Sequence, residues 1–157
     1  MLKNPAWDMV FVLMLVAAGF FWGISGGKKK MALTMLALYV LLVIFPYFPI
    51  DSILGGRAPN EIFMFRAGIF LAALLLLALF LSRAFARQAH DNCVWWEIIL
   101  LAVLAAGFLA ASILSLAPAE LIKNNTLNLS SSVLKLFADP VIAKWWTILP
   151  IFGVIFL

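Results

Sequence analysis

The sequence predicts an all-α protein that crosses a membrane several times. Of its 157 residues, 66% are hydrophobic and 11% are charged, whereas soluble domains carry about 45–50% apolar and about 25% charged residues. The mean hydropathy is +1.14. Four uncharged runs approach the roughly 20 residues that a helix needs to cross a bilayer. We therefore expect four transmembrane helices in two hairpins, followed by an amphipathic or interfacial C-terminal tail on the outer side.

The first predicted span, 9–26, sets the orientation of the chain. Gly26 and Gly27 follow its last turn, and three lysines come next: Lys28, Lys29 and Lys30. Basic residues beside a span remain on the cytoplasmic side, so they predict an N-terminus outside the cytoplasm. A cleaved signal peptide is the competing interpretation. The lysines and the further spans favour an uncleaved anchor.

The second predicted span, 31–50, follows so closely that the two spans must form an antiparallel hairpin. The segment 45–49, Phe-Pro-Tyr-Phe-Pro, combines prolines that end a helix with aromatics typical of the membrane interface. The loop 51–61 contains turn residues and a single basic residue, Arg57. We therefore expect this loop to lie outside.

The third and fourth predicted spans, 62–82 and 95–116, form the second hairpin. Arg83 and Arg87 lie in the loop between them and predict that this loop is inside. Trp95 and Trp96 are interfacial aromatics at the start of the fourth span. Residues 1–116 are thus predicted to form one four-helix transmembrane domain.

Residues 117–157 form the predicted tail. The polar run 124–132 predicts a turn and a helix N-cap, and apolar residues at helical spacing predict a short amphipathic helix over 130–138. Asp139-Pro140 should end that helix. The final apolar run, 145–157, is interrupted by Pro150 and is too short to span. It is expected to be interfacial or re-entrant, or else to begin a fifth span.

Two stripes of small residues predict close helix packing. Glycines recur at four-residue steps in the first span, and small residues do so in the fourth: Gly19, Gly23 and Gly27, and then Gly107, Ala111 and Ser115. Small residues let helix backbones approach closely within lipid. We expect the first and fourth spans to pack together through these stripes, or one stripe to mediate self-association.

Two charges near the predicted outer face form a candidate ion pair. Asp8 begins the first span, and Arg66 lies one turn into the third. An arginine at the membrane centre costs about 2.5–3.5 kcal/mol on insertion scales, and less near the edge. Either an Asp8–Arg66 pair offsets this cost, or Arg66 extends toward the headgroups while Asp8 faces water.

Catalytic and cofactor motifs are not found in the sequence. His90 and Cys93 are the single histidine and the single cysteine, which excludes a bis-histidine haem or a cysteine metal cluster within one chain. The net charge of +4 comes from cations between apolar runs, so it does not indicate nucleic-acid binding. We expect no enzyme activity, no cofactor and no metal, with the lipid bilayer and other membrane subunits as partners.

The order of these features resembles the colicin V production family of bacterial membrane proteins. The resemblance rests on Asp8, on Gly19 and Gly23, and on the basic run 28–30. The chain departs from that family at 31–33, where an acidic residue is usual, and at 90–97, where an Asp-Arg and glycine stretch is usual. The resemblance implies an inner-membrane protein linked to toxin export or envelope homeostasis.

These observations predict a non-enzymatic integral membrane protein, a small structural or accessory subunit of a membrane assembly or an envelope- or export-related protein. A small oligomeric channel or transporter is the alternative. The predicted spans contain no series of acidic residues, which disfavours a pump. A third interpretation is a membrane-enzyme subunit whose catalysis takes place on a partner chain.

Overall fold

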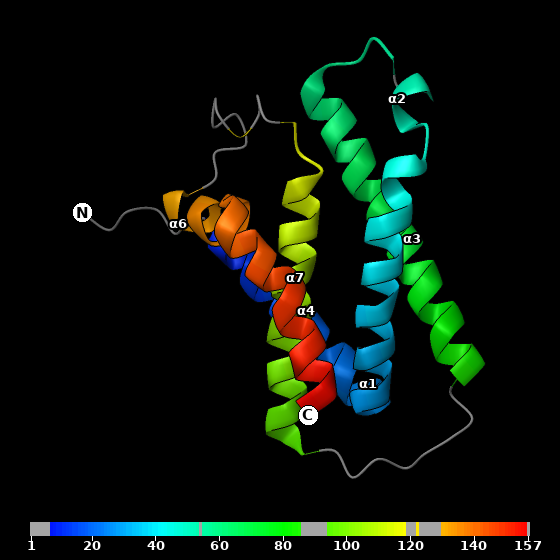
Figure 1. Ribbon diagram of the computed structural model, residues 1–157, viewed down its shortest axis with the longest axis vertical. Coiled ribbons are helices and arrows are strands. Elements are labelled where there is room, and N and C mark those ends of the chain that lie inside the picture. Colours follow the sequence, from blue (N-terminus) through cyan, green and yellow to red (C-terminus); the bar gives the residue numbers. More distant parts are fainter. Residues whose placement is uncertain (1–6, 54, 86–93, 119–121, 123–129, 157) are drawn as a thin grey trace.

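A computed structural model shows the arrangement of the helices (Figure 1). The structure describes residues 7–53, 55–85, 94–118, 122 and 130–156, and these contain helices and no strands. In chain order the elements are α1 (Trp7–Ile44), a 3-10 turn (Phe45–Tyr47), α2 (Ile50–Ile53), α3 (Pro59–Phe85), α4 (Trp95–Ser115), α6 (Ser131–Val133), a π-helical turn (Leu134–Ala138) and α7 (Pro140–Phe156). The prediction of an all-α chain is confirmed for this part of the sequence.

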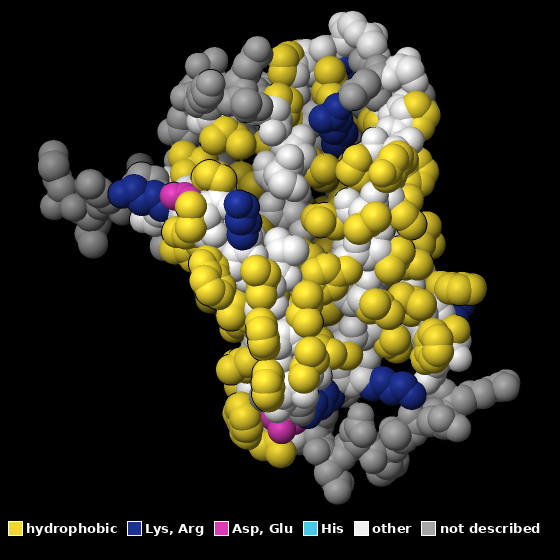
Figure 2. Space-filling view, viewed as in Figure 1, with side chains coloured by type: hydrophobic (Ala, Val, Ile, Leu, Met, Phe, Trp, Pro, Cys, Tyr) yellow, Lys and Arg dark blue, Asp and Glu magenta, His cyan; other side chains and the backbone are white. Residues whose placement is uncertain are grey.

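Three of the described helices are long and apolar enough to cross a membrane, namely α1, α3 and α4. The helix α7 is also apolar, but at 17 residues it is shorter. Large hydrophobic side chains are exposed along these helices. Figure 2 shows hydrophobic side chains over most of one face, with Lys and Arg side chains mainly toward its upper and lower parts. Length and composition are those of a membrane protein.

Helix α1 folds back on itself at Gly27. The backbone there has φ 72° and ψ −178°, a region that is essentially restricted to glycine. Twelve residues of straight helix would separate Trp22 from Thr34 by about 18 Å, yet the Trp22 indole N–H donates to the Thr34 hydroxyl at 3.1 Å. The two arms, 7–26 and 28–44, therefore lie at an angle that brings their ends together at the bend (Figure 1).

Several element boundaries differ from the predicted spans. The second arm resumes directly after Gly27, so the three lysines are helical. It ends at Ile44, and a 3-10 turn that contains Pro46 begins at Phe45. Helix α3 begins at Pro59, three residues earlier than predicted. Proline suits a first helical position because the N–H that it lacks has no partner there.

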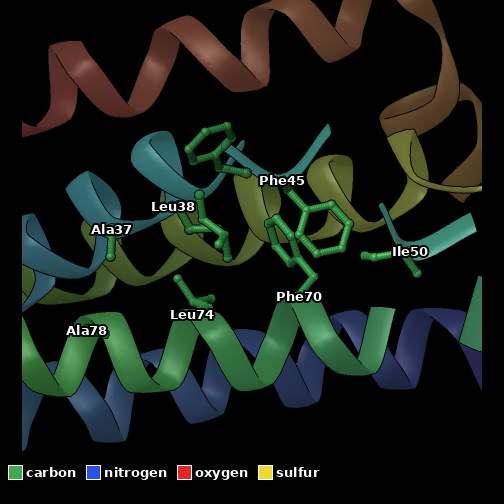
Figure 3. Packing of buried hydrophobic residues seen from close by; sticks show 9 residues of the cluster. Ala37, Leu38, Phe45, Ile50, Phe70, Leu74 and Ala78 are labelled. Atoms are coloured by element: carbon green, nitrogen blue, oxygen red, sulfur yellow. The ribbon is translucent and has the colours of Figure 1, made fainter. Parts of the chain in front are cut away.

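The main core lies where the second arm of α1 packs against α3 and α4 (Figure 3). Helix α3 contributes Phe70, Leu74 and Ala78, which recur every four residues and so share one face. The Phe70 ring meets the Phe45 ring edge-on, with 5.2 Å between centroids. Phe108 of α4 is also buried in this cluster.

The tail differs most from the prediction. Asp139 caps α7 by accepting the Val141 N–H at 2.8 Å, and Pro140 is the first helical residue. The pair therefore starts a helix as well as ending the π-helical turn, because a capping Asp followed by Pro is a strong helix start. The helix continues through Pro150 and packs along α4 (Figure 1). It is longer than the predicted segment 145–157.

The segment predicted as an amphipathic helix over 130–138 is a short α-helical turn followed by a π-helical turn. Its apolar residues Val133 and Phe137 are buried in a cluster with Ala110 and Ala111 of α4. These two residues therefore face the protein, whereas Leu136 of the same segment is 46% exposed.

We predict that Gly27→Ala lowers the free energy of unfolding by about 1–3 kcal/mol, because an L side chain is strained in this backbone region. Thermal unfolding of the detergent-solubilised protein, followed by circular dichroism, measures the change. The control is Gly68→Ala, since an added Cβ there has no heavy atom within 4 Å and alanine favours a helix. A Gly27→Ala variant as stable as the control would contradict this account of the bend.

Candidate functional site

A polar cluster surrounds the bend in α1. The Lys30 ammonium lies 3.9 Å from the centroid of the Trp22 ring and donates to the Ser25 hydroxyl at 3.1 Å. The Thr34 hydroxyl donates to the Lys30 carbonyl at 2.8 Å and accepts the Trp22 indole N–H. The Trp22 indole N–H and the hydroxyls of Ser25 and Thr34 therefore all have hydrogen-bond partners. The Lys30 ammonium makes a cation–π contact with the Trp22 ring.

An ion pair connects the bend to α4. Lys28 Nζ lies 3.0 Å from a Glu97 carboxylate oxygen, with the side chains 29% and 18% exposed. Glu97 is in the first turn of α4, where a negative charge also interacts favourably with the helix dipole. The pair joins residues 69 positions apart, so it fixes the bend against the start of α4.

Cations gather at this end of the molecule. Figure 1 shows the bend of α1, the end of α3 and the start of α4 at the same end of the bundle, and Arg83 lies in the last turn of α3. Among the described residues, no three His, Cys, Asp or Glu side chains form a group that could hold a metal ion. The polar contacts at this end can stabilise the bend between the two arms of α1, and the cations can interact with anionic lipid headgroups.

The small residues of α1 contact α4. At Gly19, an added Cβ would lie 3.5 Å from the Ala102 carbonyl oxygen, which is ordinary contact distance. At Gly23, an added Cβ would lie 2.7 Å from a methyl carbon of Ile98. The third glycine of the stripe, Gly27, forms the bend itself.

The small residues of α4 do not form a matching stripe opposite those of α1. Gly107 faces α7, because an added Cβ would overlap the ring of Trp146. Ala111 packs with Val133 and Phe137, while the Ser115 hydroxyl donates to the Ser112 carbonyl. The packing of α1 on α4 therefore combines Gly19 and Gly23 with other residues of α4.

The remaining predicted residues are distributed as follows. The side chain of Asp8, and residues Arg87, His90 and Cys93, lie outside the described residues, so the Asp8–Arg66 pair stays a prediction. Arg66 is half-buried and lines a cavity at the end of the bundle opposite the bend.

Sequence reasoning missed a link between α1 and α7. The Tyr39 hydroxyl donates to the main-chain carbonyl of Thr147, and the Tyr39 ring packs on Phe108 with 4.5 Å between centroids. Pro150 has no N–H to donate, which loosens the helical hydrogen bonding of the preceding turn. Two features of the sequence indicate such a link: Tyr39 is a polar side chain inside one apolar run, and Pro150 interrupts another.

The comparisons with known proteins found no matching family model, no similar curated protein and no similar solved structure.

We predict that Lys28 and Glu97 are energetically coupled. Lys28→Gln and Glu97→Gln should each lower the thermal midpoint by a few degrees, because partly exposed ion pairs contribute up to about 1 kcal/mol. The double variant should lose less than the sum of the single variants. Strictly additive losses in detergent melting would show that the two charges act independently.

Proposed function

We propose that the chain is a non-enzymatic, multi-pass membrane protein that packs as an accessory subunit into a larger membrane assembly, with an envelope- or export-related role. One observation supports this most strongly: α3 carries a shallow groove of about 480 Å³ along its outward face. The groove is lined by Glu61, Met64, Phe65, Gly68, Ile69 and Ala72.

This groove suits a helix of a partner subunit. Gly68 and Ala72, four residues apart, line this groove. A Cβ added at Gly68 would have no heavy atom of the described structure within 4 Å outside its own helix backbone. Small residues allow close backbone approach, which is the main source of helix association in lipid. In α3 only 17% of the apolar window is buried, against 61% in α4, so α3 offers surface to a neighbour.

We further propose four crossings of a bacterial inner membrane, with the N-terminus outside. The arms of α1, 7–26 and 28–44, contain enough residues for helices of about 30 Å and about 26 Å, close to the thickness of a bilayer core. Each arm would cross once, and α3 and α4 would supply the other two crossings. The cations at the bend and at the end of α3 favour that end as the cytoplasmic one.

We predict that Gly68→Leu separates the protein from its assembly. The full-length wild type, extracted in mild detergent, should migrate on native gels as a complex that contains other membrane chains, identified by mass spectrometry. Gly68→Leu should shift most of the protein to the position of the single chain, because the added side chain fills the groove. Leu76→Phe is the matched control, since Leu76 is 69% exposed and does not line the groove.

Two results would contradict this proposal. One is a wild-type protein that runs as a single chain under all mild conditions. The other is a stable homo-oligomer that conducts ions in liposomes, which would support the channel alternative.

We predict opposite labelling of the two ends of the bundle. In a Cys93→Ala background, Ser25→Cys places a thiol beside the lysines and Ser52→Cys places one at the far end, and both serines are exposed. An impermeant thiol reagent should label position 52 in intact cells and position 25 only after permeabilisation. The reverse pattern would place the N-terminus in the cytoplasm.

A further inference from the structure

A cavity with a cation in its wall lies at the end of the bundle opposite the bend. It has a volume of about 780 Å³. The 3-10 turn after α1, the start of α2, the start of α3 and the end of α4 with residues 116–118 form its walls. Arg66 is the one charged residue among the side chains that line it, together with Ile62 of α3, Ser115 of α4 and Leu116, which caps α4. The other walls are apolar or aromatic.

A separate apolar groove lies between α3 and α4, and the first arm of α1 and the segment 133–137 complete its lining. It has a volume of about 440 Å³, and all of its lining residues are apolar. Ala67 and Gly68 of α3 line it together with Ile113 and Leu114 of α4. These positions directly follow Arg66 on α3 and directly precede Ser115 on α4, so the cationic cavity and the apolar groove are within one helical turn of each other.

We propose that this pair of cavities binds an anionic glycerophospholipid, with its phosphate on Arg66 and one acyl chain in the groove between α3 and α4. The inference does not depend on the accessory-subunit role, although Met64 and Gly68 line both this groove and the groove proposed for a partner helix. Both volumes fall within the range of about 300–1,000 Å³ that is usual for small-molecule sites. Phosphatidylglycerol is the probe that matches this chemistry.

The charge pattern supports a lipid as the occupant. A guanidinium presents several N–H donors in a planar fork that matches phosphate oxygens. Arg66 already has a partner within the protein, and the remaining N–H donors of the fork allow it to bind a phosphate as well. A lipid carries both a phosphate that Arg66 can bind and, on the same molecule, an acyl chain that fits an apolar groove.

The binding of phosphatidylglycerol to the delipidated, full-length protein in detergent can be measured by native mass spectrometry. Diacylglycerol with the same acyl chains is the reference ligand, because it lacks only the phosphate headgroup. The wild type should bind phosphatidylglycerol about tenfold more tightly than diacylglycerol, as a charge-assisted contact implies. Arg66→Gln should abolish this preference.

Two further variants make the result specific. Arg57→Gln removes a cation that lies over the Phe65 ring, 5.0 Å from its centroid, and that does not line the cavity, so it should keep the preference. Ala67→Phe fills the groove and should weaken the binding of both lipids. Removal of a charge from an apolar helix favours membrane insertion, so the Arg66→Gln variant should still fold, and its circular dichroism checks this.

The variants test the binding of the headgroup and the binding of the acyl chain separately. A phosphatidylglycerol preference that survives Arg66→Gln would overturn the proposal, as would an equal loss in the Arg66→Gln and Arg57→Gln variants. Lipid binding that Ala67→Phe leaves unchanged would exclude the groove as the acyl-chain site. Loss of the preference in Arg66→Gln alone, with weaker binding of both lipids in Ala67→Phe, would support it.

Discussion

The backbone of Gly27 is the constraint on which the rest of the structure depends. Its positive φ ends one helical arm and lets a second begin at the next residue, so two apolar arms can both pack against the remaining helices. The bend also brings Lys28 within 3.0 Å of Glu97 and Lys30 onto the Trp22 ring. These polar contacts gather at one end, which leaves the long apolar surfaces between the ends free to face lipid.

Helix α4 is the central element around which the others assemble. It packs against α1 and α7, and its Phe108 joins the core with α3. Small residues make this possible, since Gly107 accommodates Trp146 of α7 and Ala102 accommodates the backbone at Gly19. The Trp146 indole N–H then donates to the Leu136 carbonyl at 2.9 Å, which joins α7 to the π-helical turn. Helix α3 contacts this assembly on one face and retains an open groove on the other.

The helices could be predicted from the sequence because uncharged runs and turn residues are local signals. The same signals predicted a hairpin at residues 26–30. They did not predict that the second arm begins at Lys28 with no loop after Gly27. The partners of each helix were harder to predict, because spacing shows that Gly107 is small but not that Trp146 fills the space beside it. The Lys28–Glu97 pair needs the bend and the start of α4 to be placed together first. Helix α7 is longer than the predicted segment 145–157, because Asp139-Pro140 begins the helix and Lys144 lies within it.

The distance between the two arms of α1 tests the central claim most directly. Spin labels at Met14 and Val43, which are 67% and 65% exposed, can be measured by pulsed electron paramagnetic resonance in lipid nanodiscs. A hairpin bent at Gly27 predicts one distance population well below the roughly 43 Å that 29 residues of straight helix would give. A distance near that straight-helix value would contradict the account of α1 as two arms that fold back on each other.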